Sequence, residues 1–420
     1  MDDDVIRVTA ESAAETVARK VKPGGGRVFI SGAAGEPLAL LDVYRRRPEL
    51  AAGLTFVGAS VPGINRTDWA GLHETARAEG TFLSADWRAS FEAGRFSLRP
   101  MTWFQTFSWL GETPLDAAVV QVSPPDADGA VSLGVASDLA PAVLARDVFK
   151  VALVNPAMPR VQGAVWPLSG FDLVADAPHD LLTYEAGTLD PAFDAIKRHL
   201  QGLIPDGASV QFGVGKAGIA ALAALEGMKG LRIHSGMVTD PLLPVLDSGA
   251  LTEVVTGLAA GSRDLYDRCG LDDRIRFEPS NVTHDIRVLA AIPRLVAVNS
   301  AIEIDLFGQA NAEFQDGRQI SGVGGLTDFL RGARLSKGGL PILALPASAR
   351  RGAVSRIVPR LPPTAVSVPR ADVGLVITEH GVADLRGLTL EGRAEALIGV
   401  ADPGHRDRLA TAWTEIRRGL

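Results

Sequence analysis

Residues 205–222 read PDGASVQFGVGKAGIAAL, and an earlier stretch, residues 23–41, reads PGGGRVFISGAAGEPLALL. Each passes from proline and glycine into an apolar run, and then through a glycine turn into a segment rich in alanine and leucine. A strand that enters a helix through a glycine turn is typical of the start of a β-α-β unit. Gly26 and Gly207 are 207 − 26 = 181 residues apart. The repeat therefore predicts an α/β fold of two similar domains, each an open, mainly parallel sheet flanked by helices.

Short apolar runs extend this pattern along the chain. Continuous runs of this length, rich in β-branched residues, suit strands that are covered on both faces. The runs are residues 118–122, 151–154, 295–298, 342–345 and 373–377. Helical segments alternate with them, including 217–225 and 407–418. An acidic, loop-like region followed by an amphipathic segment near 192–203 predicts the domain boundary, which gives domains 1–187 and 188–420.

Composition excludes several classes of function. The chain has 420 residues, 46% of them apolar, which is ample for a buried core. Its net charge is −7 and its isoelectric point is near 5.6, so nucleic-acid or membrane-surface binding, which needs basic patches, is not expected. The seven histidines are scattered and fit no zinc-ligand spacing, so no metal site is expected.

The sequence also indicates a compartment. The N-terminus, MDDDVIRV, lacks the basic-then-apolar pattern of a signal peptide. No uninterrupted apolar run reaches the ~18 residues of a membrane span. The single cysteine, Cys269, excludes an internal disulfide framework and fits a reducing compartment. We therefore expect a cytoplasmic protein.

One stretch of the second half combines carboxylates with a glycine loop. Residues 298–314 read VNSAIEIDLFGQANAEF and place Glu303 and Asp305 on an apolar segment. After a short spacer, residues 321–333 read SGVGGLTDFLRGA, with a glycine-rich loop at 322–325. Glycines let backbone N–H groups approach a ligand closely, and several such groups together bind a phosphate or an oxyanion. A tight turn without a ligand is the alternative.

Together with five other segments, this stretch resembles the acetyl-CoA hydrolase/transferase family, which includes the 4-hydroxybutyrate CoA-transferases of the class I CoA-transferase superfamily. The segments are QVSPPDADGAVSLGVASD (121–138), VNPAMPR (154–160), VQFGVG (210–215), RIHSGMVTD (232–240) and ITEHGVADLRG (377–387). The resemblance covers nearly the whole chain. It implies two CoA-transferase-type domains, an acyl-CoA and a small carboxylic acid as substrates, no tightly bound cofactor, and a homodimer.

The resemblance also exposes a departure at one position. Family transferases use a glutamate that forms an acyl anhydride and then a glutamyl–CoA thioester, which is covalent catalysis by a carboxylate. The matching segment here is residues 233–237, IHSGM, and Gly236 stands at the position of that glutamate. Three alternatives remain: Glu303 or Glu379 replaces the nucleophile, water attacks directly as in a thioester hydrolase, or the protein binds acyl-CoA without turnover.

Further site residues follow from the resemblance. His284 matches a polar position that faces the CoA thioester, and histidine can act as a base near pH 7. In the alternative interpretation, Thr283 and Asp285 simply start a helix over 286–292. The amides of Gly325 and Val214 are the expected oxyanion hole. The expected CoA-binding residues are Gly213, Gly215, Lys216, Gly322, Gly324 and Arg350.

The first half contributes weaker candidates. The loop SPPDADG, residues 123–129, is restricted by Pro-Pro and turned by Asp-Gly, and its alternative role is a rigid scaffold. Glu36 and Arg160 are expected on the acyl side. The glycines are not expected to form a complete G-x-G-x-x-G followed by an acid, so NAD binding is not expected.

Overall fold

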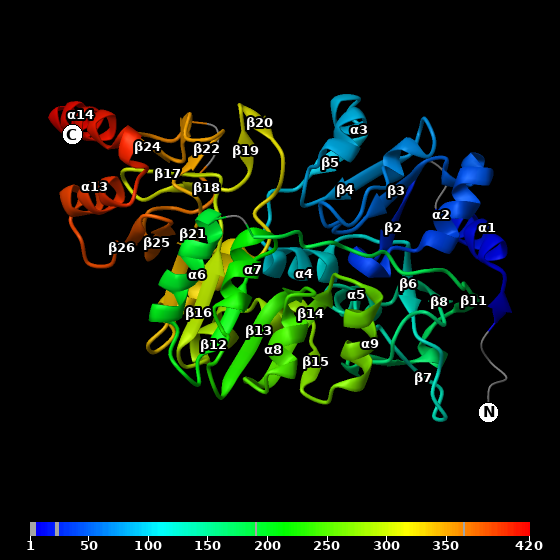
Figure 1. Ribbon diagram of the computed structural model, residues 1–420. Helices are drawn as coiled ribbons and strands as arrows, with labels where there is room; N and C mark the ends of the chain where they lie inside the picture. Colours follow the sequence, from blue (N-terminus) through cyan, green and yellow to red (C-terminus); the bar gives the residue numbers. More distant parts are fainter. Residues whose placement is uncertain (1–5, 22–24, 190, 364–365) are drawn as a thin grey trace. The chain divides into compact units, whose positions relative to one another are not determined.

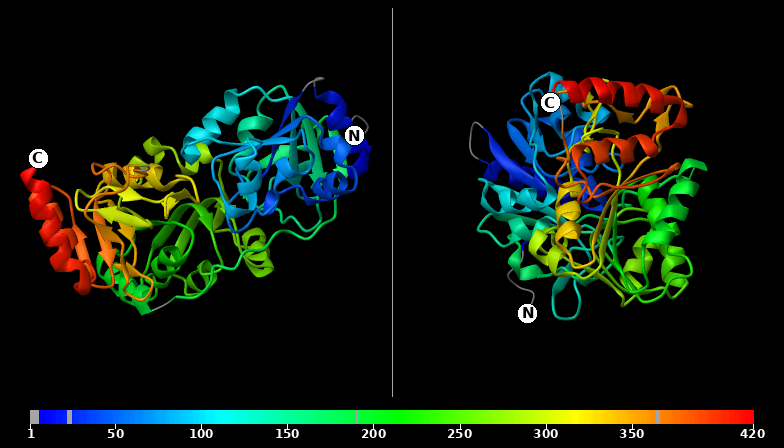
Figure 2. Two further views of the ribbon diagram at one scale, coloured as in Figure 1. Left: turned by 90° about the horizontal axis from the view of Figure 1, so that it is seen from above. Right: turned by 90° about the vertical axis from the view of Figure 1, so that its left-hand side faces the viewer.

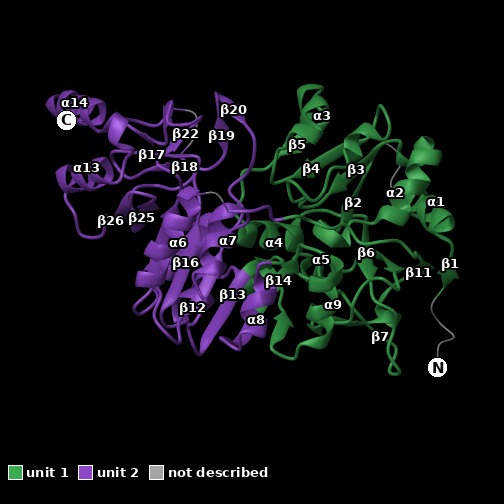
Figure 3. Ribbon diagram, in the orientation of Figure 1, with its two compact units in different colours: residues 1–185, 236–240, 255–283 green, residues 186–235, 241–254, 284–420 purple. Residues whose placement is uncertain are grey.

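The computed structural model describes residues 6–21, 25–189, 191–363 and 366–420. Residues 1–5 of the acidic N-terminus, and Pro23 and Gly24 of the first repeat, lie outside the described residues. The chain forms two compact units (Figure 3). Unit 1 contains residues 1–185, 236–240 and 255–283. Unit 2 contains residues 186–235, 241–254 and 284–420.

The sheet of unit 1 is doubly wound and parallel (Figure 1). Its strands lie in the order β1-β11-β8-β6-β2-β3-β4-β5, and every neighbouring pair is parallel. The strands, in chain order, are β1 (Arg7–Val8), β2 (Gly26–Ile30), β3 (Leu54–Val57), β4 (Arg77–Gly80), β5 (Phe96–Leu98), β6 (Ala117–Val122), β8 (Phe149–Val154) and β11 (Leu173–Asp176). The strands predicted at 118–122 and 151–154 are confirmed by β6 and β8.

Both faces of this sheet are buried. Successive side chains of a strand point to opposite faces, and in β2 Val28 and Ile30 join one apolar core while Phe29 joins the other. The first core includes residues of α1 and α2, and the second includes residues of α4 and α5. The helices of unit 1 in this region are α1 (Ala10–Lys20), α2 (Leu38–Arg46), α3 (Arg88–Glu92), α4 (Trp103–Glu112) and α5 (Ala140–Leu144).

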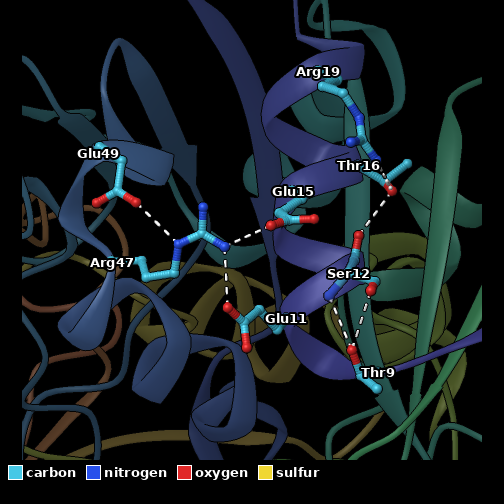
Figure 4. Close-up of polar contacts among 8 residues, drawn as sticks. All are labelled: Thr9, Glu11, Ser12, Glu15, Thr16, Arg19, Arg47 and Glu49. Carbon is cyan, nitrogen blue, oxygen red and sulfur yellow. Dashed lines mark hydrogen bonds and ion pairs between the residues drawn. The ribbon is translucent and has the colours of Figure 1, made fainter.

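Local polar contacts fix the first helix (Figure 4). Thr9 caps α1, because its Oγ1 accepts a hydrogen bond from the backbone N–H of Ser12 at 3.1 Å. Arg47, just after α2, binds three carboxylates, those of Glu11 and Glu15 on α1 and that of Glu49. These charge-assisted contacts join the end of α2 to α1 at the surface of the unit, where each ion pair contributes little by itself.

The sheet of unit 2 repeats this winding. Its strands lie in the order β26-β25-β21-β16-β12-β13-β14, and the carboxyl halves of β13 and β14 continue into unit 1, where β15 and β9 follow β14. Pairs from β25 to β13 are parallel, and the edge strand β26 is antiparallel to β25. The strands are β12 (Ser209–Phe212), β13 (Leu231–Val238), β14 (Leu251–Ala259), β15 (Ile275–Phe277), β9 (Gln162–Gly163), β16 (Leu295–Asn299), β21 (Leu340–Ala344), β25 (Leu375–Thr378) and β26 (Gly381–Asp384).

The two sheets therefore share one plan. In unit 1 the chain runs from β2 to β5 on one side and then from β6 to β11 on the other; in unit 2 it runs from β12 to β14 and then from β16 to β25. Helices that connect strands on one side of the β12–β16 pair lie on one face of the sheet, and a helix from the other side lies on the opposite face. In the right-hand view of Figure 2, α6 (Pro191–Leu203) and α7 (Lys216–Ala223) lie on one face of the sheet of unit 2, and α12 (Leu326–Leu335) lies on the other. This arrangement confirms the predicted α/β fold with two similar open sheets.

The remaining elements of the second half surround this sheet. The helices are α8 (Leu242–Asp247), α9 (Arg263–Leu271), α10 (Ser280–Thr283), α11 (Ile286–Ala291), α13 (Leu390–Gly399) and α14 (Arg406–Arg418). The short strands are β17 (Glu303–Asp305), β18 (Ala310–Asn311) and β24 (Ile357–Val358), which form one small sheet, and the hairpins β19–β20 (Phe314–Gln315, Arg318–Gln319) and β22–β23 (Ser348–Ala349, Val354–Ser355). In unit 1, β7 (Ala130–Ser132) pairs with β10 (Val165–Pro167).

Two kinds of structural feature are absent from the described residues. Within them, no helix combines the length and apolar character that crossing a bilayer requires. The same residues hold no group of three or more histidine, cysteine, aspartate or glutamate side chains arranged to bind a metal ion.

Asp138 of unit 1 has a buried carboxyl group. Its Oδ2 accepts a hydrogen bond from Nε1 of Trp103 at 3.0 Å, and its carbonyl accepts one from the N–H of Ser280 at 2.8 Å. Its Cβ lies against Gly257, where a Cβ would approach it to 3.0 Å. Complete burial raises the pKa of Asp138 to about 7, because the charged form is poorly solvated.

This raised pKa predicts a pH-dependent stability. As the pH rises, unfolded Asp138 loses its proton near the ordinary pKa of aspartate, whereas folded Asp138 keeps its proton until about pH 7. The contribution of Asp138 to the free energy of unfolding is therefore largest below about pH 4 and falls until about pH 7. We expect Asp138→Asn to lose this pH dependence. Between pH 5 and pH 8 its free energy of unfolding should rise relative to that of the wild type by up to about 4 kcal/mol, measured by urea unfolding. The exposed Asp176→Asn is the control. Identical pH slopes for wild type and Asp138→Asn would contradict the assignment.

Candidate active site

The turn from β12 into α7 is built from glycines. Gly215 has φ of +87°, which favours glycine, and it is the N-cap residue of α7. A Cβ on Gly218 would lie 1.9 Å from the carbonyl oxygen of Gly213, so helix and strand approach each other as closely as backbone allows. We call residues 213–215 the α7 turn. Gly215 and Gly218 are therefore required by backbone conformation and by steric closeness, without reference to a ligand.

The expectation about the NAD fingerprint needs one correction. Gly213, Gly215 and Gly218 do have the G-x-G-x-x-G spacing, in a parallel strand–turn–helix unit. The acid that follows β13 is Asp240, whose carboxylate accepts hydrogen bonds from the N–H and Oγ of Ser262 at 2.9 Å each. In NAD sites the corresponding acid binds a ribose hydroxyl. Here that carboxylate serves the local structure, so the glycine spacing gives no support for NAD.

The α7 turn lies at the point where the winding of the sheet reverses. β12 and β16 are neighbours, and the chain moves away from them in opposite directions. In open parallel sheets, ligands bind outside the carboxyl ends of strands at such a point. Two buried amides line this edge: Asn299 Nδ2 donates to Gln211 Oε1 at 2.8 Å, and a Cβ on Gly213 would lie 3.0 Å from Asn299 Oδ1.

A second glycine turn, residues 322–325, opens helix α12, and we call it the α12 turn. Gly325 is the N-cap residue of α12, so the first backbone N–H groups of the helix face outward from it. His284 lies directly against Gly325. A Cβ built there would approach His284 Nε2 to 2.6 Å and Phe329 Cε2 to 3.0 Å. Residue 325 must therefore be glycine if His284 keeps this position.

His284 is held by the packing of helix α11 on helix α12. Asp285 caps α11 by accepting from the N–H of Arg287 at 2.8 Å, which confirms the predicted helix start. Gly332 lies seven residues, or two turns, after Gly325 on α12 and faces Leu289 of α11; a Cβ there would meet Leu289 Cβ at 2.4 Å. Glycine at both positions allows α11 to lie close to α12 and to press His284 onto the helix start.

The burial of His284 decides its charge. Its side chain is 4% exposed, and its ring stacks obliquely on Phe329 with centroids 4.7 Å apart. Burial, and to a smaller degree the nearby His234, lower the pKa of His284 to about 3. His234 lies on β13, beside β12, and the next residue, Ser235, donates its Oγ to the carbonyl of Phe212 at 3.0 Å. His284 at the α12 turn thus lies near enough to His234, on the strand beside β12, to feel its charge.

Glu303 and Asp305 serve different local structures. Glu303 Oε1 accepts a hydrogen bond from Asn311 Nδ2 at 2.9 Å across the β17–β18 pair. Asp305 is buried and accepts from the backbone N–H groups of Phe307 and Gln309 at 3.1 and 2.9 Å. The carboxylates of the quoted apolar segment therefore stabilise the small sheet.

Glu379 follows the carboxyl end of β25, and its Oε2 accepts from the N–H of Ala347 at 2.7 Å. In the sheet, β25 lies three strand spacings from β12, a distance of about 14 Å. It lies four spacings from β13, a distance of about 19 Å. The strand that leads to Glu379 is therefore not a neighbour of β13, which carries His234. Cys269 is also remote from nucleophilic chemistry, because burial raises the pKa of its thiol to about 12.

Three remaining candidates of unit 2 lie on its surface turns. Val214 is 53% exposed at the tip of the α7 turn, so its apolar side chain is accessible. Lys216 is the first residue of α7. Arg350 has φ of +51° in the β22–β23 hairpin and pairs with Asp316 at 3.0 Å. These positions leave the CoA-binding assignment from the resemblance as an expectation.

The candidates of unit 1 are engaged within their own unit. Arg160 forms an ion pair with Asp126 and donates to the carbonyl of Ala130 at 3.0 Å, so it braces the 123–129 loop. Glu36 is buried, and its two oxygens accept from Asn65 Nδ2 at 3.0 Å and Trp69 Nε1 at 2.9 Å. Sequence reasoning missed the Gln211–Asn299 amide pair, although a polar residue at the end of an apolar strand was a visible signal.

Comparisons with known proteins identify the family of this chain. The N-terminal and C-terminal domain models of the acetyl-CoA hydrolase/transferase family match residues 9–180 and 261–413. The chain is 33% identical to 4-hydroxybutyrate coenzyme A transferase from Clostridium kluyveri over 415 residues, with 96% of each chain covered. The chain belongs to the acetyl-CoA hydrolase/transferase family. The resemblance found in the sequence is confirmed.

Solved structures of similar proteins extend over almost the whole molecule. RipA from Yersinia pestis superposes with a TM-score of 0.89 at 28% identity, covering 98% of each chain. A 4-hydroxybutyrate CoA-transferase from Porphyromonas gingivalis superposes with a TM-score of 0.80 at 31% identity, covering 99% of this chain and 98% of the other. The fold of this family member is therefore of the CoA-transferase type.

The steric argument at the α7 turn is testable by stability. We expect Gly218→Ala to lower the free energy of unfolding by about 1–3 kcal/mol, because the new methyl group collides with the carbonyl of Gly213. Gly202→Ala on α6 is the matched control. It faces open space and should stabilise the helix by about 0.5–1 kcal/mol. Equal effects of both substitutions in urea unfolding would contradict the close approach.

Proposed function

We propose that this protein is an acyl-CoA-processing enzyme that transfers CoA from an acyl-CoA to a small carboxylic acid without an enzyme carboxylate at position 236. The observation that carries this proposal is the similarity to a 4-hydroxybutyrate coenzyme A transferase over 96% of both chains. The contact of His284 with the α12 turn supports it, since it places a polar side chain beside backbone donors. Thioester chemistry has two needs, and we propose residues for the first and the acceptor acid for the second.

The first need is stabilisation of negative charge. Attack on a thioester carbonyl moves charge to its oxygen, and preorganised N–H donors stabilise that oxyanion. The amide of Gly325 at the start of α12 suits this role. The positive end of the helix dipole lies at this start and also favours a negative charge. The amide of Val214 in the α7 turn is the second proposed donor.

The second need is a nucleophile. Gly236 is half-exposed on β13, where it follows the buried Ser235, and it offers no carboxylate. Glu303 and Glu379 each accept a hydrogen bond within unit 2. We therefore propose that the carboxylate of the acceptor acid attacks the thioester carbonyl. The C–S bond breaks, giving a mixed anhydride and CoA thiolate. The thiolate then attacks the acceptor carbonyl of the anhydride, and the donor acid leaves with one acceptor oxygen.

A second function is favoured by the same glycine. With no enzyme carboxylate at position 236, water can take the place of the acceptor acid, and the protein is then an acyl-CoA thioester hydrolase. Binding of acyl-CoA without turnover is the third possibility. All three share the expected ligand and differ in what attacks the carbonyl.

Turnover assays distinguish these functions. We expect CoA transfer from members of an acyl-CoA panel when small carboxylic acids are present, with intersecting initial-rate lines in double-reciprocal plots because both substrates bind before reaction. Parallel lines would instead indicate a covalent enzyme intermediate. CoA release that does not respond to added acids would replace the proposal with hydrolysis, and CoA binding without any release would replace it with a binding function.

A designed nucleophile tests the role of position 236. We expect Gly236→Glu to form a glutamyl–CoA adduct at residue 236 on incubation with acyl-CoA, detected by mass spectrometry of peptides, and to convert the rate pattern to parallel lines. Gly236→Gln, of the same size, should form no adduct. In the wild type no adduct should appear on any residue. An adduct at Glu303 or Glu379 in the wild type would show that the nucleophile has relocated.

Two further proposals concern organisation. We propose the domain division 1–187 and 188–420, and the matched range 9–180 of the N-terminal family model supports a boundary near residue 187. We also propose a homodimer, supported by the family resemblance. Sedimentation equilibrium at several concentrations tests the second point, because a monomer has a mass of 44.1 kDa.

A further inference from the structure

We propose that Asn299 is a positioning residue, which together with Gln211 fixes the α7 turn so that the backbone N–H of Val214 stays available to the thioester oxygen. This role rests on the proposed function of the same site. Asn299 acts through the turn and not by contact with the reacting atoms.

The side-chain amides of Asn299 and Gln211 form a closed pair within unit 2. Asn299 Nδ2 donates to Gln211 Oε1 at 2.8 Å, and Gln211 Nε2 donates back to Asn299 Oδ1 at 3.3 Å. The two residues are 6% and 2% exposed, so water competes little for these groups. A flip of either amide would place donor against donor and acceptor against acceptor, and the pair therefore has one orientation.

The oxygen of Asn299 lies against the α7 turn. A Cβ on Gly213 would lie 3.0 Å from Asn299 Oδ1, and the N–H of Gly213 donates to the carbonyl of Val298 at 2.9 Å. Gly213 is thus held by a backbone hydrogen bond to β16 and by contact with the Asn299 amide. The absence of a side chain at residue 213 is what allows this approach, whereas residue 215 is glycine because of its φ of +87°.

Unit 1 has an amide side chain at the equivalent position of its sheet. Val28 of β2 pairs with Ala117, the first residue of β6, and the corresponding residue of the repeat in β12 pairs with the first residue of β16. Gln121 is the fifth residue of β6, and Asn299 is the fifth residue of β16. The two amides therefore occupy the same place beside the turn that follows β2 or β12.

In unit 1 the amide side chain holds its turn directly. Gln121 Nε2 donates to the carbonyl of Ala34, in the turn after β2, at 3.0 Å. Its Oε1 accepts from Asn155 Nδ2 at 3.2 Å, so this amide is also fixed by a second one. A buried, paired amide that recurs at one position of both sheets indicates that the fold uses it to fix the adjoining turn.

The two turns differ in the use of one backbone N–H. Ala33 of the first repeat aligns with Val214 of the second. The N–H of Ala33 donates to Asn65 Oδ1 at 2.8 Å, so a side chain of unit 1 occupies it. Among the hydrogen bonds of the described residues, the N–H of Val214 is the donor in none. The α7 turn therefore offers a donor whose place is fixed in advance, which is what stabilisation of an oxyanion requires.

Substitution separates positioning from stability. Asn299→Leu and Gln211→Met each leave one buried amide without its partner, so each should lower the midpoint of urea unfolding. The double variant removes both polar groups and should regain most of the lost stability, because removal of both partners is nearly neutral. We expect kcat to fall about 10- to 100-fold in Asn299→Leu and in the double variant alike, with KM within about threefold of the wild type.

Ser336→Ala is the matched control. Ser336 is buried at the opposite end of β16, where its Oγ accepts from the N–H of Leu295 at 3.1 Å and donates to the carbonyl of Ile292 at 2.6 Å. This substitution should lower the unfolding midpoint and leave kcat unchanged. Return of kcat together with stability in the Gln211→Met/Asn299→Leu double variant would show a merely structural role and overturn the proposal.

Hydrogen exchange measures the turn without any turnover. The N–H of Gly213 should exchange at least about tenfold faster in Asn299→Leu and in the double variant than in the wild type, because the α7 turn opens locally. The double variant is the sharpest case, since its global stability is close to that of the wild type. An unchanged exchange rate in that variant would contradict the positioning role, even if kcat falls.

The two readouts separate this role from the proposed function. If the wild type turns over no acyl-CoA, the proposed function fails, and the exchange rate of Gly213 alone decides whether Asn299 fixes the turn. If the wild type is active and Asn299→Leu has the wild-type kcat, only the positioning role fails. A lower kcat with faster exchange, in a protein that is active as the wild type, supports both.

Discussion

His284 lies so close to Gly325 that residue 325 has no room for a side chain, and the rest of the candidate site depends on this contact. It requires α11 to lie against α12, which Gly332 permits two turns further on. It also places a buried, neutral imidazole at the start of a helix, where backbone N–H groups and the helix dipole already favour an anion. The steric contact, the burial of the ring and the helix dipole thus coincide at the start of α12, and each alone would be weak evidence for an anion site.

The winding of the sheet explains why this point is accessible to a ligand. Parallel strands direct their carboxyl ends to one edge, and the reversal between β12 and β16 separates the loops there. The α7 turn and the Gln211–Asn299 pair lie at this edge. Unit 1 repeats the reversal between β2 and β6, and Glu36 with its partners Asn65 and Trp69 follows β2. Duplication thus provides two similar edges, and the histidine pair belongs to unit 2.

Sequence patterns predicted the fold well because they report local physics. Buried parallel strands are continuous apolar runs, and β6, β8, β16, β21 and β25 all fall on such runs. The cap of α11 by Asp285 was likewise visible as a local signal. The site was harder to predict, because its contacts join distant residues. The burial that neutralises His284 comes from Phe329 and α12, and the hydrogen bond that engages Glu303 comes from β18. Spacing along the chain contains no information about such partners.

The central claim is that the α12 turn holds the carbonyl oxygen of a CoA thioester. The most direct measurement is a crystal structure of the protein with a non-hydrolysable ketone analogue of an acyl-CoA. The account predicts the ketone oxygen at about 2.7–3.1 Å from the backbone nitrogen of Gly325. An analogue bound with its carbonyl away from the start of α12 would contradict it.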